Sequence, residues 1–295
     1  MRVVDLTKHL HKKPILDGIS FEINLGEITG LIGRNGSGKT TLFRTMTHLY
    51  QKEQGDVFIE EQSLYKYPKL REKIFYLDEN FHFLSNQKPK RIARYYQEFY
   101  SNFDMEKYIS LMTKYELNQD FKISQYSKGN QALYKMILAF SCRATYYLFD
   151  EPFDGLDMIV KKKVLSLLLH EVSFNQCGVM ISSHNLIELE SLIDHAIILH
   201  QGKIYKDFDL DQVKEVSKKY QMVFQKKEVP GLIKQNCQII QVQGRVLIGI
   251  FDKMTDDLYE EILALDPVLF DEVPLTLEDI FASQFTNESD YQLFH

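Results

Sequence analysis

The sequence predicts an α/β fold, and three features of the chain indicate it. A glycine-rich loop at residues 33–40 stands between the apolar run 28–32 and a segment whose apolar residues recur at helical spacing. Two later runs, 146–149 and 179–183, read as buried strands and are followed by acidic residues or a histidine. Continuous apolar runs of this kind are typical of parallel strands that are buried on both faces. A chain of 295 residues is long enough for such a core and for more than one domain.

Residues 33–40 fit the phosphate-binding loop pattern, in which a glycine and four further residues precede Gly-Lys-Thr. The glycines permit backbone conformations that a Cβ atom would forbid, so the amides of the loop can turn inward as an anion nest. A helix that begins near Gly38 adds free N–H groups and the positive end of its dipole. An accidental glycine-rich turn is the alternative, but the flanking strand and helix argue against it. The residues expected to bind phosphate are Asn35, Gly36, Ser37, Gly38, Lys39, Thr40 and Thr41.

The acidic pair Asp150 and Glu151 directly follows the apolar run 146–149. In open α/β sheets, ligands bind at the carboxyl ends of the strands, so both side chains should emerge beside the phosphates. We expect the Thr40 hydroxyl to be a Mg²⁺ ligand and Asp150 to hold the ion through its water shell. We expect Glu151 to act as the catalytic base that accepts a proton from an attacking water. A strand that merely meets a polar loop also ends in this way, so the prediction depends on the phosphate loop.

His184 follows the predicted strand 179–183. A single histidine after a strand is most often a surface residue. This one falls at the same sheet edge as Glu151, so we expect it to contact Glu151 or the terminal phosphate and count it with the catalytic residues.

Composition narrows the class of protein. The chain is 44% hydrophobic and 26% charged, as is ordinary for a globular protein, and its net charge of −6 argues against a large nucleic-acid footprint. Cys142, Cys177 and Cys237 lie far apart, so we expect reduced thiols of a cytosolic protein rather than a metal site or disulfides. We see no signal peptide and no run as long as a membrane span, so any membrane role should come through a partner.

Between about residues 80 and 140 the pattern becomes helical, with aromatic and aliphatic residues at helical spacing. We expect a helical subdomain whose aromatic residues form the core of a small bundle rather than a ligand site. Residues 207–295 contain no catalytic constellation. They read as a small α/β appendage with paired strands at 239–242 and 246–251, a helix at 258–265 and an N-cap at Thr276, suited to packing or dimerisation.

Over residues 1–206 these motifs resemble the nucleotide-binding subunit of ATP-binding-cassette (ABC) transporters. Residues 126–131, Tyr-Ser-Lys-Gly-Asn-Gln, stand where the family has its Leu-Ser-Gly-Gly-Gln signature. Residues 154–157, Asp-Gly-Leu-Asp, match the family's distal loop, and His184 matches its switch histidine. The resemblance implies an ABC-type core of the phosphate-loop NTPase class, with a mixed sheet, an antiparallel β subdomain and a helical signature subdomain, followed by the C-terminal appendage.

The resemblance also implies a mechanism with ATP and Mg²⁺ as cofactors. Two cassettes, identical or different, pair head to tail, and each ATP lies between the phosphate loop of one and the signature of the other. Ser127, the Gly129 amide and Asp157 then join the nucleotide site. The expected partner is an integral membrane permease that holds the chain at the cytoplasmic face of the membrane, and no nucleic acid is expected. A short permease helix is expected to dock near Phe81, Phe83 and Tyr95, for which bundle core is an equal alternative.

Four positions depart from the family pattern. Lys128 replaces a glycine and Asn130 a glutamine in the signature, and Leu10 stands where an aromatic residue usually stacks on adenine. Glu79 takes the place of the lid glutamine and could still face Mg²⁺ or water as a metal ligand. These variants resemble Gram-positive bacterial exporters of peptides, antimicrobials or lipids, and the tail segment 277–281 resembles theirs as well.

Two other functions compete with a transporter motor. A soluble ABC ATPase that acts on ribosomes or DNA would carry two cassettes or a long coiled coil. This chain has one cassette, and Lys39 and Gly129 are only 90 residues apart (129 − 39). A small-molecule kinase would account for residues 33–40 but not for the signature or the distal loop.

Overall fold

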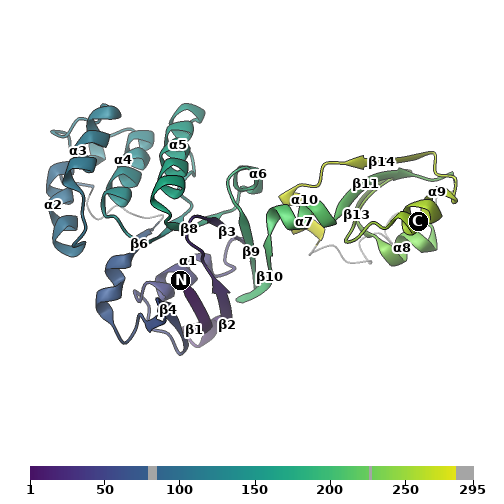
Figure 1. The fold of residues 1–295 in the computed structure, drawn as a ribbon, viewed down its shortest axis with the longest axis horizontal. Helices are drawn as coiled ribbons and strands as arrows, with labels where there is room; N and C mark the ends of the chain where they lie inside the picture. The colour runs from purple at the N-terminus through teal and green to yellow at the C-terminus, as the bar shows by residue number, and fades with distance from the viewer. Residues whose placement is uncertain (79–84, 226–227, 284–295) are drawn as a thin grey trace. The chain divides into compact units, whose positions relative to one another are not determined.

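The computed structural model describes residues 1–78, 85–225 and 228–283. These residues form two compact units (Figure 1). The first unit contains residues 1–184 and 193–207, and the second contains residues 185–192 and the described residues from 208 onward.

A six-stranded sheet with the order β10-β9-β3-β8-β7-β6 organises the first unit. Five of its strands, β6, β7, β8, β3 and β9, pair in parallel, and every residue of β3, β7 and β8 is buried. Because the strands are parallel and in register, the ends of β3, β7 and β8 meet at one edge of the sheet. The strands are β3 (Ile28–Ile32), β6 (Ile74–Leu77), β7 (Tyr146–Asp150), β8 (Gly178–Ser183), β9 (His195–His200) and β10 (Lys203–Asp209).

Tight turns with left-handed backbone join two pairs of neighbouring strands. The β9–β10 turn has φ of 47° at Gln201 and 75° at Gly202, as a two-residue hairpin turn requires. The β1–β2 turn likewise has φ of 49° at His11 and 66° at Lys12. It belongs to an antiparallel sheet with the order β2-β1-β4-β5, whose strands are β1 (Arg2–Leu10), β2 (Lys13–Glu22), β4 (Gln54–Ile59) and β5 (Gln62–Ser63).

The first helix, α1 (Lys39–Met46), packs its apolar face into a core that both sheets share. Leu42, Phe43 and Met46 are fully buried there. In the sequence, apolar residues at helical spacing continue to Leu49, which predicts a longer helix than the structure has. The helix ends at Met46, His48 takes a positive φ of 61°, and Leu49 is 64% exposed. The short 3₁₀ helix η1 (Pro68–Lys73) follows β5.

The predicted helical segment contains α2 (Pro89–Phe99), α3 (Met105–Lys114), the 3₁₀ turn η2 (Ile123–Gln125) and α4 (Lys128–Ser141), and α5 (Met158–Asn175) packs against α4. Its apolar stripe is only partly core. Ile92, Tyr108 and Met112 are buried, but Tyr95 is 38% and Phe99 70% exposed, so the expectation of an aromatic core was wrong for these two rings. A short helix on the outside of a bundle buries one face only.

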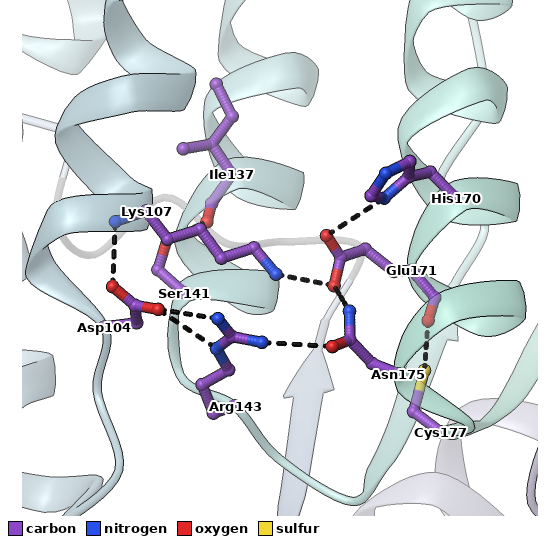
Figure 2. Close-up of polar contacts among 9 residues, drawn as sticks. All are labelled: Asp104, Lys107, Ile137, Ser141, Arg143, His170, Glu171, Asn175 and Cys177. Atoms are coloured by element: carbon purple, nitrogen blue, oxygen red, sulfur yellow. Dashed lines mark hydrogen bonds and ion pairs between the residues drawn. The ribbon is translucent and has the colours of Figure 1, made fainter.

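A network of polar side chains joins α3, α5 and the end of α4 (Figure 2). The Lys107 ammonium and the Asn175 amide donate to the same oxygen of the buried Glu171 carboxylate, at 2.6 and 2.7 Å. Arg143, just after α4, donates to Asn175 at 3.0 Å and to Asp104 at 2.7 Å. Asp104 caps α3 by accepting the backbone N–H of Lys107 at 2.8 Å. These hydrogen bonds therefore form a closed ring that begins and ends at Lys107.

The second unit is built on a strand–helix–strand–strand–helix–strand sequence, β11-α8-β12-β13-α9-β14. Its sheet order, β12-β13-β11-β14, with antiparallel neighbours throughout, is the split βαβ topology. Helices α8 and α9 lie on one face of this sheet (Figure 1), and their apolar side chains share a core with it. The elements are α6 (Leu186–Glu190), α7 (Leu210–Val216), β11 (Lys218–Val223), α8 (Gly231–Asn236), β12 (Gln238–Gln243), β13 (Val246–Phe251), α9 (Asp256–Leu263), β14 (Leu269–Val273) and α10 (Leu277–Ser283).

The strands expected at 239–242 and 246–251 and the cap at Thr276 are confirmed, since the Thr276 hydroxyl accepts the Asp279 N–H at 3.2 Å. The predicted domain division into 1–206 and 207–295 stays a prediction. Within the described residues, no helix is long and apolar enough to cross a lipid bilayer. The three cysteines are free and buried, and burial raises the pKa of Cys177 and Cys237 to about 12, so these thiols stay protonated.

Candidate functional site

The phosphate loop links β3 to α1 and requires glycine at two positions for different reasons. A Cβ atom on Gly33 would lie 2.5 Å from the Ser37 hydroxyl oxygen and 2.7 Å from the Leu199 carbonyl oxygen, so there is no room for one. Gly38 caps α1 with a φ of 111°, a conformation that side chains strongly disfavour. The loop is therefore shaped as a cradle that ends on the first N–H groups of a helix, where phosphate binds favourably.

Two side chains of the cradle have unusual surroundings. The Lys39 ammonium donates to the Gly33 carbonyl at 2.7 Å, and its side chain is only 8% exposed. The Ser37 hydroxyl is buried, and no partner for it is found among the residues that the structure describes. A buried cation and an unpaired hydroxyl beside a glycine-lined cradle fit a polyphosphate.

Asp150, the last residue of β7, connects the phosphate loop to β8. Its carboxylate accepts a hydrogen bond from the Thr40 hydroxyl at 2.7 Å and another from the Ser182 hydroxyl at 2.5 Å, and the residue is 2% exposed. No group of three or more His, Cys, Asp and Glu side chains that could hold a metal is found in the described part of the chain. The Thr40–Asp150 pair thus fits Mg²⁺ only if phosphate oxygens or waters complete the ligand shell.

Glu151 lies beside both Lys39 and His184. Its carboxylate is 3.9 Å from the Lys39 ammonium, and its Oε2 atom is 2.9 Å from the His184 Nδ1 atom. The backbone of Glu151 has a φ of 48°, and its N–H donates to the Ser182 hydroxyl at 3.1 Å. The structure therefore brings together the two side chains predicted as catalytic, while their catalytic roles stay predictions.

The signature and distal-loop residues cap two neighbouring helices. The Ser127 hydroxyl accepts the Asn130 N–H at 3.2 Å at the start of α4, and Asp157 accepts two N–H groups at 3.0 Å at the start of α5. The two starts touch, because a Cβ on Gly129 would lie 2.8 Å from a Val160 methyl group. No hydrogen bond or ion pair within the described residues joins Ser127 or Gly129 to the phosphate loop.

Sequence reasoning missed Ser182 and Arg44. Ser182 pairs with Asp150 in the β7–β8 register. The available signal in the sequence was its position in a predicted buried strand, two residues before His184. Arg44 on α1 donates to Asp78 at 2.9 Å and to Tyr50 at 2.9 Å, and Tyr76 donates to Asp78 at 3.0 Å. Burial, together with the Asp150 and Asp78 carboxylates, raises the pKa of the Tyr76 hydroxyl, which therefore stays a donor.

Three residues of interest, Glu79, Phe81 and Phe83, lie outside the described residues. Tyr95, the third residue of the expected permease contact after Phe81 and Phe83, is 38% exposed on α2, and the Arg91 guanidinium donates to its hydroxyl at 3.0 Å. Its role in docking stays a prediction.

Fold and site together define a nucleotide-binding protein of the phosphate-loop class. The family model described as "ABC transporter" matches residues 16–154. The ABC transporter ATP-binding protein YtrB of Bacillus subtilis is 29% identical over 280 residues, which are 95% of this chain and 96% of that protein. An uncharacterized ABC transporter ATP-binding protein, MJ1023 of Methanocaldococcus jannaschii, is 32% identical over 69% of this chain and 75% of its own length. The chain belongs to the ATP-binding proteins of ABC transporters.

Two further similarities bear on the site. The bacitracin transport ATP-binding protein BcrA of Bacillus licheniformis is 26% identical over 75% of this chain and 73% of that protein. A solved structure of an ATP-binding subunit of an ABC transporter superposes with a TM-score of 0.66 at 25% identity, over 72% of this chain and 91% of that one. The mixed sheet, the antiparallel sheet and the helical segment are thus those of an ABC ATPase, as the sequence predicted.

Proposed function

We propose that this ABC ATPase powers an exporter of peptides, antimicrobials or lipids by working on an integral membrane permease. The observation that carries the proposal is the convergence of Lys39, Thr40, Asp150, Glu151 and His184 at the shared end of β3, β7 and β8. A kinase of the phosphate-loop class would share Lys39 and Thr40 but has no use for the capped signature beside the distal loop. The similarity to the bacitracin transport protein BcrA supports a role in the transport of an antimicrobial peptide.

The residues of the phosphate loop, 35–41, bind the triphosphate through backbone amides and the Lys39 ammonium. Thr40 and Asp150 hold Mg²⁺, to which Glu79 is also assigned. When bound, Mg²⁺ supplies charge neutralisation at the phosphate oxygens. Glu151 accepts the proton of the attacking water. His184 lies against the same carboxylate and holds it toward the terminal phosphate.

Ser127, Gly129 and Asp157 act on the nucleotide of a second cassette, which is a copy of this chain or a related one. The Ser127 hydroxyl uses a lone pair to cap α4, so its proton can still be donated to a phosphate oxygen. The capped start of α4 adds free backbone N–H groups. ATP then holds two surfaces together by its charge, and hydrolysis releases them. Closure favours one state of the permease through its higher affinity for the ATP-bound pair.

Co-fractionation tests the transporter assignment directly. The full-length chain, expressed at native level, is expected to sediment with membranes. After extraction of these membranes with mild detergent, it is expected to co-purify with one integral membrane protein. Membrane-bound chain should be released when that protein is deleted. Recovery in ribosomal fractions alone, with no membrane-bound share, would contradict the proposal and favour the soluble ABC ATPase.

A further inference from the structure

Lys128 is a departure from the family pattern, and its side chain reaches the distal loop of the same chain. It is the first residue of α4, and its ammonium is 3.8 Å from a carboxylate oxygen of Asp154. The same ammonium lies over Gly155, where a Cβ atom would collide with it. Gly155 has a φ of 64°, so glycine is favoured there for its conformation as well. The Lys128 side chain thus contacts two adjacent residues of the distal loop, Asp154 and Gly155.

The distal loop in turn begins at the predicted catalytic base. The Asp154 N–H donates to the Glu151 carbonyl at 3.3 Å, which closes the turn that follows β7. Glu151 itself, the first residue of this turn, has a left-handed backbone with a φ of 48°. A shift of Asp154 therefore changes the backbone that aims the Glu151 side chain. A continuous path of contacts runs from Lys128 through Asp154 to Glu151.

A second contact keeps the two segments in register. Gly129, the next residue of α4, lies against Val160 in the first turn of α5, too close for a Cβ atom. Asp157 caps that turn with two hydrogen bonds of 3.0 Å. The Gly129–Val160 contact fixes the distance between the starts of α4 and α5. The Lys128 side chain adds a contact to Asp154, earlier in the distal loop.

We propose that Lys128 is a positioning residue, which holds Asp154 and thereby orients the Glu151 carboxylate within the same chain. The inference rests on the proposed function only in that Glu151 is taken as the base. Lys128 and Asp154 are 68% and 57% exposed, and an ion pair so exposed contributes little to stability. Loss of the Lys128–Asp154 ion pair should therefore lower the rate of ATP hydrolysis and leave the free energy of unfolding nearly unchanged.

Steady-state hydrolysis of Mg-ATP by the full-length chain tests the proposal. Lys128→Gln and Asp154→Asn are each expected to lower kcat by roughly tenfold, a size typical of residues that act through a contact network. The KM for ATP is expected to change less than about twofold, since neither residue is assigned to the nucleotide of its own chain. The double variant should be no slower than either single variant, because both remove the same contact. Lys128→Arg, which keeps the charge, should recover most of the rate.

A matched control is present in the same unit. The Lys203–Asp17 ion pair has a length of 3.1 Å and side-chain exposures of 68% and 56%, nearly those of Lys128 and Asp154. Lys203→Gln and Asp17→Asn should leave kcat and KM unchanged. All variants should melt within about 2 °C of the unmodified chain, as expected when surface pairs are removed.

Two results would overturn the inference. If Lys128→Gln raises the KM for ATP while Asp154→Asn has no effect, the ammonium acts on a nucleotide and not on the distal loop. If neither variant changes kcat, the contact has no catalytic consequence. A failure of the proposed function is seen separately, because the unmodified chain would then lack hydrolysis that depends on Mg²⁺ and Glu151.

Discussion

Ser182 shows how one hydroxyl can serve two carboxylates of the site. It donates to Asp150 at 2.5 Å and accepts the backbone N–H of Glu151 at 3.1 Å, and it is fully buried. The predicted Mg²⁺ residue and the predicted base are thus held by the same side chain on the neighbouring strand. Local sequence patterns identified Asp150 and Glu151, because the pair stands at the end of an apolar strand in a chain that also has a phosphate loop. They could not identify Ser182, because its contact with Asp150 spans 32 residues.

Replacing Ser182 with alanine should therefore affect both stability and turnover. The Asp150 oxygen and the Glu151 N–H lose a buried partner, which costs about 1–3 kcal/mol of unfolding free energy. We expect kcat to fall roughly tenfold, since a slight displacement of a catalytic group has effects of at least this size. Chemical denaturation and phosphate release measure the two effects. Ser141→Ala, which removes an equally buried hydroxyl within α4, is the control and should reduce stability only.

At the scale of elements, the predicted site residues lie at the starts of helices, and a network of polar contacts supports the opposite end of one of them, α5. The phosphate loop, the signature and the distal loop each precede a helix, and two of the three are capped by the side chain of a predicted site residue. At the other end of α5, Lys107 donates to Glu171, which ties that helix to α3, and Asn175 of α5 donates to the same carboxylate (Figure 2). Helical periodicity predicted α1 and the helical segment that contains α3 and α4. It could not predict the tie, because Lys107 and Glu171 are 64 residues apart in sequence.

The Lys107–Glu171 pair is buried, with side-chain exposures of 12% and 4%, so removing one partner leaves a charge without compensation. Lys107→Met alone is expected to lower the unfolding free energy by about 3–5 kcal/mol. Lys107→Met combined with Glu171→Leu should recover a large part of that loss, because no buried charge then remains unpaired. Urea denaturation of the three proteins provides the comparison. A double variant that is less stable than Lys107→Met would contradict this account.

Asp104 gives the same network a dependence on pH. The backbone N–H of Lys107, followed by the Arg143 guanidinium, lowers the pKa of its carboxyl below the ordinary value. The unfolded chain therefore binds this proton more readily, and stability decreases as the pH falls. We expect the contribution of Asp104 to be complete at neutral pH and to be lost progressively below about pH 5. In Asp104→Asn this part of the acid dependence should be missing, which unfolding curves at several pH values would show.

At the scale of the whole molecule, the chain crosses between its two units more than once. Residues 185–192 belong to the second unit, although they follow His184 directly. Within that unit Glu190 pairs with Lys214 at 2.7 Å and accepts the Leu277 N–H at 3.0 Å. The sequence indicated the appendage and two of its strands. It did not indicate that a segment beside the switch histidine belongs to it, because no local pattern marks α6 as separate from the first unit.

A chain truncated after residue 207 should therefore be less stable than a simple two-domain division suggests. Glu190 would lose both partners, and Leu189, fully buried in the full chain, would lose neighbours of its own unit. We expect a melting temperature lower by at least about 3 °C, the shift that roughly 1 kcal/mol produces in a domain of about 150–250 residues. A truncated chain that melts at the same temperature as the full chain would contradict this prediction.

The central claim is that Glu151, held between Lys39 and His184, is the base of a Mg²⁺-dependent ATPase. The measurement that tests it most directly is phosphate release by Glu151→Gln at saturating Mg-ATP, with bound nucleotide quantified in the same sample. Loss of a general base lowers rates by roughly 10²–10⁴-fold, so we expect turnover to fall by at least 10²-fold while ATP remains bound. Hydrolysis at the rate of the unmodified chain, with ATP bound to the same extent, would contradict the account.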